Sequence, residues 1–335
     1  MTDDRSDARV PRDPAGDPTD DADAGFPAQM RTARTEFEQH VAHARAEFEE
    51  ANERIKKRTG RDLILAILIG VGIGAVALGS LIFIKWVFIL LALGVVVLGV
   101  VEFSRALRGS DRRIDLVPQI IAAVVVLLSG AFLELWLHWV ALFAGLAVVV
   151  VWRLIAQMAA ADGRRYNAVT SDVLAGTFVV FYVPFLASMA MVLLRQDRGE
   201  WWILAFIAVA VVADTAAYAA GLTFGKHPMA PRISPNKTWE GFAGAVVGAI
   251  AAGVLLGIFL LGVPWWAGAI LGAVILGTAT TGDLGESMVK RDLGIKDMSS
   301  WLPGHGGVLD RLDSILPSAT AALALYYLFA PMGAA

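Results

Sequence analysis

The sequence predicts an all-α integral membrane protein with about nine transmembrane helices. Hydrophobic residues make up 57% of the chain and the mean hydropathy is +0.62, whereas charged residues reach only 18%. A soluble domain carries roughly 25% charged residues. In addition, apolar runs of about 20 residues recur after Asp62, and a helix of that length crosses the hydrocarbon core of a bilayer.

The first 61 residues differ in composition from the rest. Residues 1–27 form an acidic tail, rich in Asp, Pro, Gly and Ala, which is predicted to be disordered because it has too little apolar surface to offset chain entropy. Residues 28–61 are predicted to form a charged cytoplasmic helix; a short coiled coil and a helix lying on the membrane surface are the alternatives. That prediction depends on an apolar spacing of 4-3-4-3-4 through Phe37, Val41, Ala44, Phe48, Ala51 and Ile55.

The apolar runs in residues 62–335 predict a multi-span membrane domain, which we expect to be the catalytic domain. The first apolar run begins at Leu63 and lacks a small-residue cleavage pattern, so we expect it to remain as an anchor. The chain has no cysteine, which excludes disulfides and thiolate sites. The predicted spans are 63–84, 86–104, 116–135, 137–156, 171–194, 201–220, 241–262, 264–282 and 314–334.

The distribution of Lys and Arg predicts the orientation. With the N-terminus in the cytoplasm, the inward loops between spans hold 14 basic residues and the outward loops hold 3. We therefore expect a multi-pass protein of the cell membrane, with a cytoplasmic N-terminus and a C-terminus outside. The outward residues are Lys85, Arg195 and Arg198.

Glycine patterns inside the spans indicate close helix packing. Gly70, Gly72 and Gly74 do not follow a strand, so a nucleotide-binding loop is the weaker interpretation. The pairs Gly244-x-x-x-Gly248 and Gly253-x-x-x-Gly257 predict a helix interface, either within the protein or between the subunits of a homodimer.

Residues 287–314 pack acids, bases and glycines between apolar segments. A Ser-x-x-Lys-Arg run at Ser287 leads through Lys296-Asp297 and Pro303-Gly304-His305-Gly306-Gly307 to Asp310-Arg311-Leu312-Asp313. This stretch resembles the signature of the phosphatidate cytidylyltransferase family, also called CDP-diacylglycerol synthase.

A second polar region resembles the same family. It contains Asp214-Thr215-x-Ala-Tyr218 and a loop with Ser234, Asn236, Lys237, Thr238 and Glu240-Gly241. Asp214 follows a dozen apolar residues, and an acid below the membrane surface, which costs on the order of 3 kcal/mol, is usually functional. The loop predicts a phosphate-binding turn, with a simple helix N-cap and membrane anchor as the alternative.

Carboxylates near the signature predict a magnesium site. Asp283 ends one predicted span and Asp310 begins the next, so both ends are expected to meet in one cytoplasm-facing pocket. Asp310 and Asp313 are expected on one face of a helix start. Hard carboxylate oxygens suit Mg²⁺, which fills its shell with water and phosphate oxygens. Helix capping by the two acids is the alternative, although it does not account for Asp283.

The glycines around His305 allow backbone to approach a ligand closely. The histidine itself is open to two interpretations, a catalytic base or a structural hydrogen-bonding residue. Cationic groups that suit a polyphosphate stand at Lys290, Arg291 and Arg311.

The resemblance implies the reaction of CTP with phosphatidate to give CDP-diacylglycerol and pyrophosphate, with Mg²⁺ as cofactor and no nucleic-acid partner. By this resemblance the catalytic residues are Asp283, Asp310, Asp214, Lys290 and Arg291, with metal ligands Asp283, Asp310 and Asp313. The residues expected to bind the substrates are Lys226, Ser234, Asn236, Lys237, Thr238, Ser287, His305, Gly306, Gly307 and Arg311.

Two other functions are compatible with many spans. A CTP-dependent polyprenol or phytol kinase would transfer the γ-phosphate to an alcohol and release CDP. A transporter could use Asp214 and Asp283 for ion coupling, but its polar residues should line both halves of a pathway, whereas here they gather at one membrane face.

Overall fold

The computed structural model describes residues 63–160, 164–299 and 306–333. The chain divides into two compact units, Met1–Ile64 and Leu65–Ala335. The predicted tail 1–27, the predicted charged helix 28–61 and His305 lie outside the described residues. The fold of the second unit positions every other predicted site residue.

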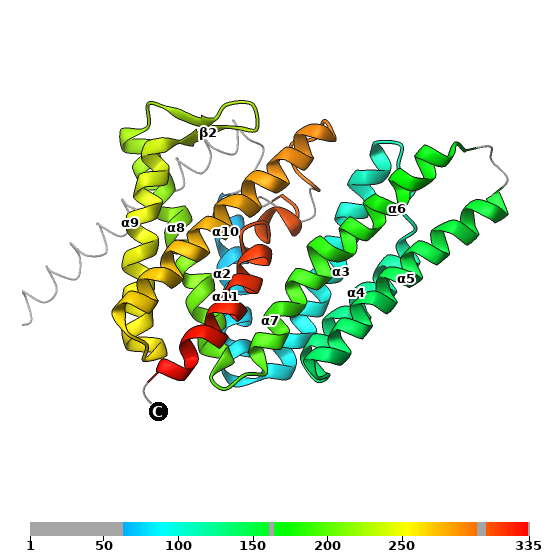
Figure 1. The fold of residues 1–335 in the computed structure, drawn as a ribbon. Coiled ribbons are helices and arrows are strands. Elements are labelled where there is room, and N and C mark those ends of the chain that lie inside the picture. Colours follow the sequence, from blue (N-terminus) through cyan, green and yellow to red (C-terminus); the bar gives the residue numbers. More distant parts are fainter. Residues whose placement is uncertain (1–62, 161–163, 300–305, 334–335) are drawn as a thin grey trace, which may run out of the picture. The chain divides into compact units, whose positions relative to one another are not determined.

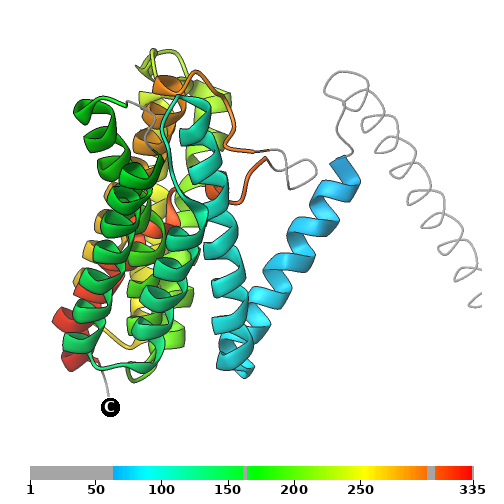
Figure 2. The ribbon, with the colours of Figure 1, turned by 90° about the vertical axis from the view of Figure 1, so that its right-hand side faces the viewer.

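The second unit consists mainly of helices, most of which run side by side in Figures 1 and 2. Within the described residues each predicted apolar range falls largely on helices, because a run of about 20 apolar residues can satisfy its backbone groups in lipid only by folding into a helix. The helices are α2 (Leu63–Phe83), α3 (Lys85–Gly109), α4 (Leu116–Phe132), α5 (Leu135–Ala160), α6 (Tyr166–Val180), α7 (Leu186–Leu194), α8 (Gly199–Phe224), α9 (Trp239–Leu256), α10 (Trp265–Asp292) and α11 (Ile315–Phe329).

Seven helical stretches within the described residues are long and apolar enough to cross a membrane. They are α3, α5, α8, α10, the continuous run Tyr166–Leu194 through α6 and α7, Trp239–Leu261 around α9, and Ile315–Met332 around α11. Two shorter apolar stretches are Gly70–Phe83 of α2 and helix α4. Many large apolar side chains on these helices are exposed, as lipid contact requires. The chain is therefore a multi-pass membrane protein.

A π-helical turn, Phe181–Phe185, joins α6 to α7. Pro184 lies inside it and has no backbone N–H to donate, which explains why the regular helix is interrupted there. The predicted span 171–194 is thus one helical stretch with a local widening.

Glycines bring α8, α9 and α10 into backbone contact. A Cβ built on Gly244 would lie 2.4 Å from Ala220 Cβ of α8, and one on Gly253 would lie 2.3 Å from the carbonyl oxygen of Gly268 in α10. Both distances are too short for any side chain. The predicted interface through Gly244 to Gly257 is therefore confirmed, and it lies within the protein.

The glycines of the first span have no such role among the described residues. Gly72 and Gly74 lie in the middle of α2, and a Cβ on either would have no neighbour within 4 Å. Their helical position excludes a nucleotide-binding loop of the strand-loop-helix kind.

The region predicted as a proline-containing loop is a β-hairpin. Strands β1 (Pro228–Ala230) and β2 (Ser234–Thr238) pair antiparallel, with Pro228 opposite Thr238 and Ala230 opposite Ser234. Figure 1 shows the hairpin at the ends of α8 and α9. The hairpin was not predicted, because its strands are short and polar and contain proline, which normally indicates a turn.

The predicted boundaries around the signature were wrong in two places. Helix α10 continues to Asp292, so Asp283 lies inside a helix rather than at its end. Basic residues in the last turn and the Glu286–Lys290 pair, spaced i to i+4, favour this extension. Second, Asp310 lies in a 3-10 turn, η3 (Leu309–Arg311), and α11 begins only at Ile315.

The late start of α11 has a physical cause. Pro317 cannot donate a hydrogen bond to the carbonyl of Asp313, so an α-helix can include Pro317 only in its first turn. Asp310 and Asp313 therefore do not share one face of an α-helix, contrary to the prediction. The Asp313 carbonyl packs instead against Gly282 of α10, where a Cβ would lie 2.1 Å from its oxygen.

Candidate active site

A cavity of about 570 Å³ opens where the hairpin meets α8, α9 and α10. The apolar residues of its lining include Leu222, Phe242, Ala245 and Leu276. The polar residues of the lining include Asp214 from α8, Asn236 and Lys237 from β2, Thr238, and Thr280 and Asp283 from α10. A cavity of this kind can receive a molecule that has both a charged group and an apolar part.

Asp283 is the best-connected acid of the cavity. Its carboxylate forms an ion pair with Lys237 Nζ of the hairpin, and it accepts a 3.4 Å hydrogen bond from Ser287 Oγ one helical turn further along α10. The Asp283 and Lys237 side chains are each 28% exposed, so both can still reach a ligand. The structure thus brings together three predicted site residues from two distant segments.

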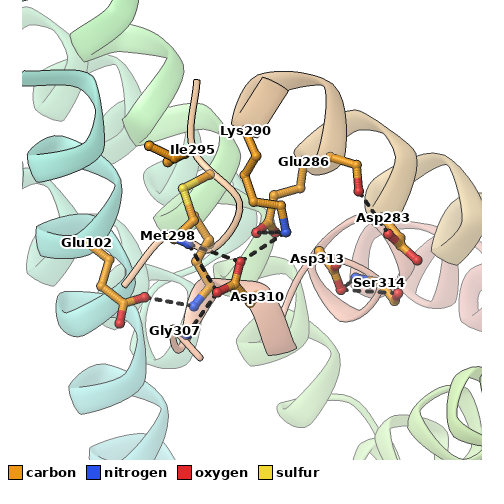
Figure 3. A network of polar contacts seen from close by, with 12 residues as sticks. Glu102, Asp283, Glu286, Lys290, Ile295, Met298, Gly307, Asp310, Asp313 and Ser314 are labelled. Carbon is orange, nitrogen blue, oxygen red and sulfur yellow. Dashed lines mark hydrogen bonds and ion pairs between the residues drawn. The ribbon is translucent and has the colours of Figure 1, made fainter. Parts of the chain in front are cut away.

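Asp310 has a second set of partners, shown in Figure 3. Its carboxylate accepts hydrogen bonds from Lys290 Nζ at 3.0 Å, Gly307 N–H at 2.8 Å and the N–H of Met298 at 3.2 Å. Lys290 Nζ also lies 3.3 Å from Glu286 Oε1 on the same helix. Lys290 therefore stands between two carboxylates that are almost fully buried.

Asp310 and Asp313 have opposite electrostatic surroundings. Burial alone would raise the pKa of Asp310, but the hydrogen bonds from Gly307 N–H and Lys290 outweigh it and hold this pKa below its usual value. Burial raises the pKa of Asp313 to about 6, and the negative charge of Asp283 adds to the increase. Asp310 thus keeps its charge near neutral pH, whereas Asp313 lies close to a change of charge.

The hairpin residues occupy different positions around the cavity. Asn236, Lys237 and Thr238 line it, and Ser234 stands at the start of β2. The Thr238 hydroxyl accepts a hydrogen bond of 3.1 Å from Gly241 N–H, so Thr238 is the N-cap of α9, as the alternative interpretation proposed for this loop. Lys226 is exposed, and its backbone N–H donates a hydrogen bond to the Glu240 carboxylate.

The remaining predicted residues surround the signature turn. Arg291 Nε donates a hydrogen bond of 3.2 Å to the carbonyl of Ile233, which connects α10 to the hairpin. Gly306 has a φ of +80°, a conformation that favours glycine. Arg311 belongs to η3, next to Asp310.

The donors present fit a magnesium ion at the cavity. Asp214 and Asp283 both line it. Mg²⁺ typically binds one or two protein carboxylates and fills its other coordination positions with water and phosphate oxygens. Among the described residues the cavity lining does not include Asp310 or Asp313. A metal shared by Asp283 and Asp310 therefore stays a prediction.

Two buried acids near the signature were missed from the sequence. Glu286 and Glu102 are each only 1% exposed. Glu102 is on α3, and its carboxylate accepts hydrogen bonds from Ser299 and from the N–H groups of Val308 and Leu309. A signal was present, because Glu102 follows a long apolar run, as Asp214 does, and an acid in such a run is a candidate functional residue.

Comparison with known proteins shows which enzymes the chain is similar to. The phosphatidate cytidylyltransferases of Mycobacterium bovis and Mycobacterium leprae are each 40% identical to the chain, over 278 and 281 residues. Each match covers 79% of this chain and 88% of the relative. The phosphatidate cytidylyltransferase of Brucella suis is 42% identical over 152 residues, 45% of this chain and 54% of the relative.

The sequence model of the cytidylyltransferase family matches residues 64–329, which contain α3 to α11, the hairpin and both polar regions described above. The match covers most of the chain and includes every candidate site residue. The chain therefore belongs to the cytidylyltransferase family.

Proposed function

We propose that this protein is a phosphatidate cytidylyltransferase, which converts CTP and phosphatidate to CDP-diacylglycerol and pyrophosphate. The observation that carries the proposal is the cavity between α8, α9, α10 and the hairpin, in a chain 40% identical to enzymes of that name. The cavity combines apolar lining residues for a lipid with the Asp283–Lys237 pair for a phosphate.

The reaction requires two anions to approach each other. A phosphate oxygen of phosphatidate attacks the α-phosphorus of CTP and forms a P–O–P bond, while the bond from that phosphorus to the β-phosphate oxygen breaks. Pyrophosphate leaves with the electron pair of the broken bond. No side-chain nucleophile is needed, so the protein contributes charge screening and orientation.

Basic side chains from two elements would supply the screening. Lys237 comes from β2, while Lys290 and Arg291 come from the polar end of α10. In the structure Lys237 and Lys290 neutralise Asp283 and Asp310, and each can instead donate to a phosphate oxygen when a substrate supplies the negative charge. Further phosphate contacts are proposed for Lys226, Ser234, Asn236, Thr238, Ser287, His305, Gly306, Gly307 and Arg311.

Magnesium would be held by Asp283 and Asp310, with Asp214 and Asp313 in support. When bound, the ion would withdraw charge from the phosphate oxygens and stabilise the leaving pyrophosphate. The support for this assignment is the set of carboxylates along α10, η3 and α8, together with the cations that already balance them.

The proposed topology has nine crossings, counting α2 and α4 as spans, with the N-terminus in the cytoplasm and the C-terminus outside. The hairpin and the signature turn would then face the cytoplasm, where CTP is found. The excess of basic residues in the inward loops supports this orientation. A homodimer stays a prediction, since the Gly244 to Gly257 interface is used within the protein.

The test uses purified protein, phosphatidate, Mg²⁺ and CTP labelled at either the α- or the γ-phosphate. Cytidylyl transfer carries the α-label into the lipid phase and releases the γ-label as pyrophosphate. A lipid kinase with an alcohol substrate would give the reverse distribution, with labelled lipid only from γ-labelled CTP. Label that stays entirely in CTP with phosphatidate present would refute the proposal.

A further inference from the structure

Glu102 is a buried carboxylate that follows a long apolar run in α3. It is 1% exposed, and its neighbours Phe103 and Ser104 are buried as well. A buried carboxylate is costly unless polar groups compensate it, and removing its partners is destabilising. The residue therefore needs compensation from outside α3.

That compensation comes from hydrogen bonds. Glu102 Oε1 accepts from Ser299 Oγ at 2.5 Å and from Val308 N–H at 3.0 Å, and Oε2 accepts from Leu309 N–H at 3.0 Å. Within the described part of the chain no Lys or Arg lies within ion-pair distance of Glu102. Its charge is balanced by N–H and O–H dipoles of the signature turn, which lies about two hundred residues away in the chain.

The same turn divides its N–H groups between two carboxylates. Gly307 N–H donates to Asp310, and the next two N–H groups, of Val308 and Leu309, donate to Glu102. A Cβ on Gly307 would lie 2.9 Å from Glu102 Oε2 and 3.0 Å from Asp310 Oδ2, so both acids crowd this glycine. Figure 3 shows Glu102 and Asp310 converging on Gly307.

We propose that Glu102 is a positioning residue, which caps the turn Gly306–Leu309 from α3 and so fixes the direction of the Asp310 carboxylate. The proposal deepens the proposed function and depends on it. Two N–H groups at the start of η3 have no helical partner, and a carboxylate is their strongest acceptor. Without Glu102, the N–H groups of Val308 and Leu309 would donate to other acceptors. The adjacent peptide would then rotate, and the Gly307 N–H that donates to Asp310 would change direction.

Glu102→Gln is the sharpest test, because it preserves the volume of the side chain. One end of a Gln amide can still accept a hydrogen bond, but the other end is a donor and would face an N–H group. We expect turnover to fall about 10- to 100-fold, the usual effect of losing a partner that orients a metal or phosphate ligand. Ser104→Ala is the matched control, since Ser104 is buried on the same helix and its hydroxyl has no hydrogen-bond partner among the described residues.

Amide hydrogen exchange of the metal-free protein supplies a readout that does not need activity. In Glu102→Gln the amides of Val308 and Leu309 should exchange faster, whereas peptides from α8 and α9 should match the wild type. Unchanged turnover, or faster exchange spread evenly over all helices, would overturn the proposal. If Glu102→Gln does not fold, Glu102→Asp is measured in both assays, with faster exchange confined to residues 306–311 and lower turnover as the supporting result and unchanged turnover as the refuting one.

The two proposals fail in different ways. A wild-type protein that transfers no label from α-labelled CTP would end the proposed function. The exchange comparison would still decide whether Glu102 holds the signature turn.

Discussion

Asp283→Asn should separate chemistry from stability. The substitution keeps the shape of the side chain and an oxygen for Ser287, but it removes the charge that pairs with Lys237. Because both partners are 28% exposed, the pair contributes about 1 kcal/mol or less to folding. Turnover should fall at least about 100-fold, which corresponds to about 2.7 kcal/mol of lost transition-state stabilisation. The effect on the reaction is thus expected to exceed the effect on the fold.

The assay is the initial rate of α-label transfer to lipid over a Mg²⁺ titration, with thermal unfolding measured in the same detergent. Asp292→Asn is the matched control, because it makes the same substitution at an exposed position of the same helix. Near-wild-type turnover of Asp283→Asn at every Mg²⁺ concentration would refute the role of Asp283 and move the proposed site toward Asp214 or Asp313.

Three further predictions follow from the geometry. Lys290→Met leaves Glu286 and Asp310 without their shared cation, so the free energy of unfolding should fall by on the order of 3 kcal/mol. The control, Lys296→Met, lies at an exposed position and should change this free energy little. Equal unfolding midpoints for the two variants would contradict the prediction. Single cysteines at Lys296 and Asp197, both exposed, should react with an impermeant reagent from opposite sides of sealed cells, position 197 from outside; external labelling of position 296 would reverse the topology. The folded chain holds the Asp313 proton more tightly than the unfolded chain, since the pKa rises from 3.8 to about 6. Without divalent cations this contribution to stability is full below pH 3.8 and is lost as the pH rises through about 6, and Asp313→Asn should abolish that dependence in thermal unfolding scans.

The helices of the fold could be predicted from the sequence because their signal is local. An apolar run of about 20 residues specifies a helix wherever it occurs, and within the described residues each of the nine predicted ranges falls largely on helices. The same signal gave the wrong helix end at Asp283. The apolar run stops there, but α10 continues with the same hydrogen-bonding pattern to Asp292. Hydropathy reports burial in lipid, and it does not report where a helix ends.

The candidate site could be predicted only in part, because its contacts are not local. Asp283, Lys237 and Asp310 were found from their polar surroundings, but their pairing with particular cations depends on how α10, η3 and the hairpin meet. Glu102 follows a long apolar run, as Asp214 does, but its partners could not be predicted, because they are about two hundred residues away and two of them are backbone N–H groups. The β-hairpin was missed because its residues favour turns.

The close contact of α8, α9 and α10 has a mechanical consequence for the cavity that they border. A Cβ on Gly272 would lie 2.3 Å from the carbonyl oxygen of Ala249, so no side chain between α9 and α10 can rotate to make room there. The hairpin on the other side is linked to α10 by polar contacts, Lys237 with Asp283 and Arg291 with Ile233. Such contacts can exchange partners with water or a ligand at small cost. The cavity therefore has one stiff wall and one compliant wall, and a bulky headgroup meets the least resistance from the hairpin.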